Sequence, residues 1–148
     1  MTNDQKREVT YLESPGESDP WSENGDALHE DGKGKAYDLE ERTAQFGEAV
    51  IRFVKKIPRS PGNDRLVGQL VGAATSIGAN YCEADDGASK KDFRNKICIC
   101  RKEARETKFF LRMVAAAEDT LKPEARVLWQ EAKELHLIFA SIWRKNKE

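Results

Sequence analysis

Apolar side chains recur at alternating spacings of three and four residues in four long stretches of the chain, a pattern typical of amphipathic α-helices. No stretch shows the strict alternation of a half-buried strand. Four such helices joined by short connections can bury their apolar stripes together only as an antiparallel up-down-up-down bundle, an all-α fold. The predicted helices are residues 38–57, 63–84, 89–118 and 123–142.

Residues that favour helix starts lie at these boundaries. Asp38 is predicted to be the N-cap of the first helix, Asn63 or Asp64 that of the second and Ser89 that of the third. Pro123 suits the first turn of the fourth helix, where its missing N–H is not needed. The bundle is therefore predicted to occupy residues 37–148.

Charge divides the chain at the same place. Residues 1–36 hold nine acidic and four basic side chains, a net charge of −5, whereas the rest of the chain carries +4. The first segment has too few apolar groups to offset the entropy of ordering and is predicted to be a disordered acidic arm. Two roles stay open for it: a solubilising tail, or a segment that lies on a basic surface of its own bundle and competes with a polyanionic ligand.

The third helix carries a basic stripe with few acids to balance it. Such a face favours binding to phosphate, with a plain solubilising surface as the alternative. The predicted nucleic-acid contacts are Lys91, Arg94, Arg101, Arg105, Lys108 and Arg112.

Large apolar side chains also lie outside the predicted core stripes of the third and fourth helices. Such groups usually mark an interface, so we expect a homo-oligomer; the alternative is that they cover the margins of the core. The predicted interface residues are Phe109, Phe110, Met113, Trp129 and Trp143.

The second helix combines glycines with a line of polar side chains beside its apolar stripe. Glycines inside a helix are costly, so Gly68, Gly72 and Gly78 predict the close approach of another backbone. The polar line must find partners once buried, and we interpret it as a network that sets helix register, with an acid/base site as the alternative. The predicted network comprises Gln69, Ser76, Asn80, Glu83 and Glu106.

Other chemistry finds little support in the residue pattern. Cys82, Cys98 and Cys100 lie in helical patterns and are predicted to be free, buried thiols in a reducing compartment. No Glu-x-x-His pair or phosphate-binding glycine loop occurs, so we expect no metal, cofactor or enzymatic activity. No apolar run is long enough to span a membrane, and a cytoplasmic location is expected.

The chain also resembles the bacterial four helix bundle protein family, which includes proteins encoded in intervening sequences of large-subunit ribosomal RNA genes and the accessory variability determinant of diversity-generating retroelements. The resemblance covers nearly all of residues 37–148. The residues that carry it are Tyr37-Asp38-Leu39, Arg42, Phe46, Gln69-Leu70, Ala74, Ser76-Ile77, Asn80, Glu83, Lys91-Asp92-Phe93, Lys102-Glu103-Ala104-Arg105-Glu106-Thr107 and Glu131-Ala132-Lys133-Glu134-Leu135.

The resemblance implies a non-enzymatic homopentamer with a basic surface. Its retroelement member is an accessory partner of a reverse transcriptase and its RNA template, so a reverse transcriptase or another protein is an implied partner. Together with the basic stripe, this predicts a non-catalytic oligomeric module that binds structured RNA. The alternative is a protein-interaction scaffold that binds no nucleic acid.

Overall fold

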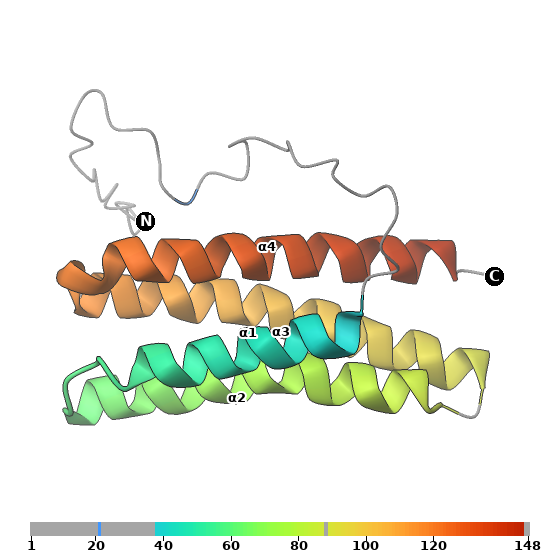
Figure 1. Cartoon of the computed structure of the whole chain (residues 1–148), viewed down its shortest axis with the longest axis horizontal. Helices are drawn as coiled ribbons and strands as arrows, with labels where there is room; N and C mark the ends of the chain where they lie inside the picture. The colour runs from blue at the N-terminus through green and yellow to red at the C-terminus, as the bar shows by residue number, and fades with distance from the viewer. Residues whose placement is uncertain (1–20, 22–37, 88, 147–148) are drawn as a thin grey trace, which may run out of the picture.

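Four α-helices pack side by side in the computed structural model of the protein, which describes Trp21 and residues 38–87 and 89–146. Each helix runs antiparallel to the preceding one, which confirms the all-α, up-down-up-down bundle (Figure 1). The predicted arm, residues 1–36, lies outside the described residues except for Trp21. The helices are α1 (Leu39–Val54), α2 (Pro61–Asp85), α3 (Lys90–Ala117) and α4 (Lys122–Lys145), with a 3₁₀ turn at Asp119–Leu121 before α4.

Three of the four predicted helix starts are confirmed. The Asp38 carboxylate accepts a hydrogen bond from the backbone N–H of Glu41 at 3.1 Å. The Ser89 hydroxyl accepts one from the N–H of Asp92, also at 3.1 Å. Pro123 lies in the first turn of α4. The Asp38 and Ser89 caps each satisfy a backbone donor that the helix itself leaves without a partner.

The predicted start of α2 at Asn63 or Asp64 is wrong. The helix begins at Pro61, and the hydroxyl of Ser60 is its N-cap, accepting from the N–H of Asn63 at 3.0 Å. Proline is well suited to the first helical position because its φ is preset. The Asn63 side chain instead donates to Glu118 Oε1 at 3.0 Å, which ties the start of α2 to the end of α3.

One apolar side of each helix faces the bundle axis. Helix α3 packs along both α2 and α4, whereas α1 packs mainly on α2 and meets α4 over a shorter stretch. The first helix ends at Val54, earlier than expected, yet Ile57 still reaches the core from the following turn. No described helix combines the length and apolar character needed to cross a membrane. The largest fully buried apolar side chains are Val50, Leu70, Ile77, Ile97, Leu111, Val114, Leu135 and Phe139.

The predicted close approach of a backbone to the glycines of α2 occurs at Gly78. A Cβ placed on Gly78 would lie 3.0 Å from Thr43 Oγ1 and 3.2 Å from Thr43 Cβ on α1. By contrast, nothing lies within 4 Å of a Cβ placed on Gly68 or Gly72, and both are exposed. Gly78 is therefore the glycine of this group that lets α1 and α2 pack closely within the chain.

Alanine substitutions should separate these two kinds of glycine. Gly72→Ala should raise the free energy of unfolding by up to about 1 kcal/mol, because alanine is the better helix former. Gly78→Ala should lose that gain, because overpacking against Thr43 costs about 1–3 kcal/mol. Urea denaturation of both variants tests this, and an equal stabilisation at the two positions would contradict the close contact.

An ionic cluster that the residue pattern did not reveal joins α1 to α4. Arg42 Nε donates to Glu131 Oε1 at 2.7 Å, and an Arg42 terminal nitrogen donates to Glu134 Oε2 at 2.6 Å. Burial lowers the pKa of Arg42, but the hydrogen bonds and charges of Glu131 and Glu134 outweigh this effect, so the pKa is raised. A half-buried, charge-assisted contact of this kind is stronger than an exposed pair.

We expect Arg42→Gln to destabilise the protein by about 1–3 kcal/mol, because two neighbouring carboxylates lose their shared cation. The matched control is Arg52→Gln, which removes an exposed pair with Glu48 at 3.9 Å. Such exposed pairs are worth less than about 1 kcal/mol. Denaturation at low salt compares the two variants, and equal losses would show that the α1–α4 cluster has no special role.

The three cysteines are free in the described structure, but the prediction that all are buried is wrong. Cys100 is fully buried and its thiol lies 3.4 Å from the Ile77 carbonyl oxygen; burial raises its pKa to about 12. Cys98 is half-buried and Cys82 is exposed. Cys82 lies near the end of α2, close to Glu40 of α1.

Candidate nucleic-acid interface

Three cations of α3 lie beside its buried ridge, on the side that faces α4. Arg94, Arg101 and Lys108 recur every seven residues, so two helical turns bring each back to the same side. All three contact tryptophans of α4. We call the surface along which these three cations meet Trp129 and Trp143 the α3–α4 seam.

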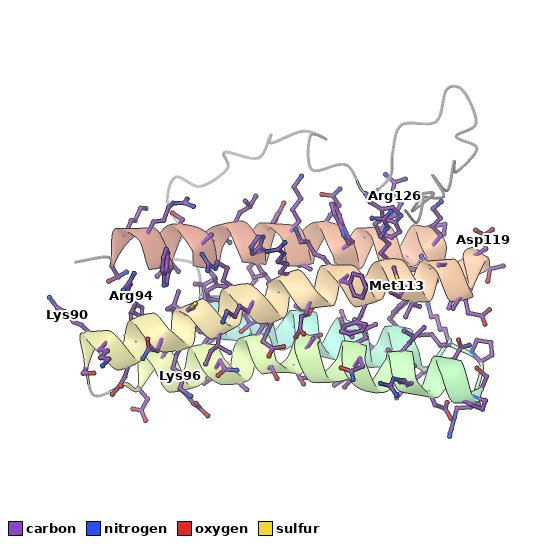
Figure 2. The ribbon with its side chains drawn as sticks, turned by 180° about the vertical axis from the view of Figure 1, so that it is seen from behind. Lys90, Arg94, Lys96, Met113, Asp119 and Arg126 are labelled. Carbon is purple, nitrogen blue, oxygen red and sulfur yellow. The ribbon has the colours of Figure 1, made fainter. Side chains whose placement is uncertain are left out.

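At one end of the seam, two guanidinium groups stack on one indole. Arg94 Cζ lies 4.6 Å and Arg101 Cζ 4.8 Å from the ring centroid of the half-buried Trp143. Figure 2 shows Arg94 on the side of α3 next to α4. Cation–π contacts of this kind hold an arginine in place without using its N–H donors.

Arg94 keeps a donor that the fold does not use. Its Nε is buried and has no hydrogen-bond partner within the part of the chain that the structure describes. A terminal nitrogen of Arg101 makes one long contact, 3.9 Å to the sulfur of Cys98. Buried donors are almost always paired, so an unused one needs an explanation, and an anionic ligand is one.

The other end of the seam is closed. Trp129 is only 4% exposed, and the Nζ atoms of Lys108 and Lys133 lie 5.5 and 5.9 Å from its ring centroid. Both lysines are themselves 7% exposed. Trp21 packs edge-on against Trp129, with their ring centroids 5.7 Å apart. In the single chain, then, Trp129 offers no free surface for an interface. Lys108 is buried as well, although the sequence predicts it to be an exposed member of the basic stripe.

The remaining stripe residues are accessible. Lys91, Arg105 and Arg112 are exposed, and they form no ion pair with any acid in the described part of the chain. Helix α4 adds the exposed Arg126, labelled in Figure 2, which the sequence reasoning missed. Arg126 precedes Lys133 by seven residues, the same spacing that revealed the stripe on α3.

Acidic side chains of α4 lie on its opposite side, toward α1. Besides the pair that binds Arg42, Glu124 Oε2 lies 2.7 Å from Lys56 Nζ. A shallow groove of about 280 Å³ between these helices is lined by Ala49, Arg52, Phe53, Lys56, Glu124, Val127 and Leu128. Its cations already have acidic partners, unlike the exposed arginines of α3.

The described residues do not assemble the predicted polar network. The Asn80 amide donates to the Ser76 carbonyl of its own helix at 2.8 Å, and Glu83 forms an ion pair with Lys96. Gln69 and Glu106 are exposed. The line falls at the margin of α2 instead of inside the core, so its members are satisfied locally or by solvent. No group of three or more His, Cys, Asp or Glu side chains within the described residues is arranged to hold a metal ion.

An apolar patch does remain on the outer face of α3. Phe109 is 56% exposed and meets Phe110 edge-on, with their ring centroids 5.4 Å apart. Phe110 also packs against the core, and the half-buried Met113 follows on the same helix (Figure 2). Of the predicted interface residues, Phe109 is the one that the fold leaves most open.

Fold and surface together define an antiparallel four-helix bundle with a basic seam between its last two helices. The chain belongs to the 23S rRNA-intervening sequence protein family, whose model matches residues 35–141. The family resemblance seen in the sequence is therefore confirmed.

A solved structure supports the same relationship. The chain is similar to a protein of unknown function from the S23 ribosomal protein family of Bacteroides thetaiotaomicron VPI-5482, with 25% sequence identity and a TM-score of 0.65. The match covers 72% of this chain and 95% of that one. A comparison with curated proteins finds no match.

Proposed function

We propose that the protein is a non-catalytic, oligomeric bundle that binds structured RNA through the α3–α4 seam and the exposed arginines beside it. One observation carries the proposal: Arg94, Arg101, Arg105 and Arg112 have no acidic partner among the described residues, while acids of α4 pair with α1 and with Lys56 in the turn that follows it. Separating the two signs onto different faces leaves one face able to attract phosphate.

The planar guanidinium group of arginine matches phosphate better than the point charge of a lysine does. Seven residues of α-helix span about 10 Å, so Arg94 and Arg101, or Arg105 and Arg112, present guanidinium groups at regular intervals along α3. Each guanidinium offers several N–H donors that match phosphate oxygens. Stacking on Trp143 reduces the motion of two of them before any ligand arrives.

The second candidate function is a protein-interaction scaffold, which the exposure of Phe109 favours. A reverse transcriptase or another protein would be the partner that the family resemblance implies. Salt separates the two functions, because binding to nucleic acid releases counterions and weakens steeply with salt, whereas an apolar contact does not.

Charge reversal tests the seam together with the exposed arginines beside it. The triple variant Arg101→Glu, Arg105→Glu, Arg112→Glu should abolish binding of a labelled structured RNA, measured by fluorescence anisotropy, without changing helicity. A matched control reverses the exposed Arg52 of α1, Lys55 at the C-cap of α1 and Arg65 of α2, which alters the net charge equally.

The salt dependence gives the expected size of the effect. A single neutralised arginine, as in Arg105→Gln, should leave binding measurable and reduce the steepness of log affinity against log salt by about one. In the control the slope should stay near that of the unmodified protein. Equal binding by the seam variant and the control would contradict the assignment, and binding that is insensitive to salt would favour the scaffold.

Assembly makes a separate prediction. In solution we expect a mass that is a multiple of the 16.7 kDa chain, five copies by family resemblance, measured by light scattering. Phe109→Ser should lower that mass because it removes an exposed apolar contact. Leu137→Ser is the control, since Leu137 is 54% exposed on α4. A single-chain mass for the unmodified protein would contradict the oligomer.

A further inference from the structure

Trp21 is the one residue of the acidic segment that the structure places, and it lies on the basic side of the bundle. Its indole is half-buried, packs against the hydrophobic core, and meets the ring of Trp129 at an interplanar angle of 68°. Edge-to-face contact is a preferred geometry for two aromatic rings. The contact is therefore a specific docking position.

The docking position is surrounded by positive charge. The Nζ atoms of Lys108 and Lys133 lie 5.5 and 5.9 Å from the Trp129 ring centroid, so Trp21 packs onto an indole that already has two ammonium groups near it. Lys108 belongs to the predicted basic stripe of α3. The exposed Arg112 lies one turn further along the same side of α3, and Arg126 one turn before Trp129 on α4.

The sequence around Trp21 has the complementary charge. Residues 17–26 contain Glu17, Asp19, Glu23 and Asp26 and no basic side chain. Asp19 and Glu23 are each two residues from Trp21, so covalent geometry keeps their Cα atoms within about 7 Å of that of Trp21. Any carboxylate contact with the basic face near Trp129 is therefore within reach of this segment once its indole is anchored there.

We propose that Trp21 anchors the acidic segment 17–26 on the α3–α4 seam, where it acts as an intramolecular competitor of polyanionic ligands. The docking itself stands on the Trp21–Trp129 contact and the charges around it; the competition rests on the proposed RNA-binding function. Because the competitor is covalently tethered, it is present at a high effective concentration. RNA must displace it to reach the cations near Trp129.

Docking is tested first without any RNA. The chain has three tryptophans, so labelling with ¹⁵N-tryptophan gives three indole signals. Trp21→Ala should remove its own signal and shift that of Trp129, while the signal of Trp143 at the far end of the seam stays in place. An unshifted Trp129 signal overturns the docking. Trp21 is the residue to change because Trp129, being buried, is needed for folding.

Competition is tested by RNA binding of the full chain. If the docked segment leaves the seam open in roughly a tenth to a third of molecules, Trp21→Ala should tighten the apparent affinity roughly three- to tenfold. The double variant Asp19→Asn, Glu23→Gln should act in the same direction. The control, Glu8→Gln with Glu13→Gln, removes the same charge further from the anchor and should change the affinity less.

The outcomes separate the two proposals. Seam-dependent RNA binding that is unchanged in Trp21→Ala overturns the competition while the proposed function stands. If neither the unmodified chain nor Trp21→Ala binds RNA, the proposed function and the competition both fail, and a shift of the Trp129 signal still supports the docking. Tighter binding in both arm variants, with little change in the control, supports the full proposal.

Discussion

The buried ridge of α3 is the constraint on which the rest of the structure depends. Ile97, Cys100, Ala104 and Leu111 are all fully buried, and α3 packs along both α2 and α4. This burial fixes the rotation of α3 about its own axis. The cations that lie beside the ridge are therefore placed along the junction of α3 with α4.

Aromatic side chains on α4 partly offset the desolvation of cations that this rotation causes. Cations brought to a helix junction lose solvent, and no acid among the described residues pairs with Arg94 or Arg101 there. The face of Trp143 partly compensates through cation–π contact, but the Arg94 Nε donor stays unused. An unsatisfied buried donor costs about 1–3 kcal/mol, so this corner of the bundle is not optimised for stability alone.

Charge is sorted by helix pair. Acids of α4 pair with Arg42 of α1 and with Lys56 in the turn after it. The α1–α4 pair is also the pair of neighbouring helices with the least contact. Cations gather along the other side of α4. A net charge of −1 for the chain conceals both this sorting and the strongly acidic first segment. The same sorting gives Trp21 and its acidic neighbours a complementary surface on their own chain.

Local sequence information determined the fold class, three of the four helix starts and the presence of a basic stripe on α3. Those features depend on periodicity and capping, which act within a few residues. The start of α2 was missed because Ser60 and Pro61 offered a cap three residues before the expected one.

Only the tertiary structure decided which side chains of each sequence pattern are exposed and which are covered. Periodicity gives the direction of a side chain around its helix but not what covers it. Lys108 and Trp129 were therefore expected at the surface and are buried, while the polar line of α2 was expected inside and is not. The ion pairs of Arg42 and the contact of Trp21 with Trp129 join residues far apart in the chain, and such contacts depend on packing geometry that no local pattern encodes.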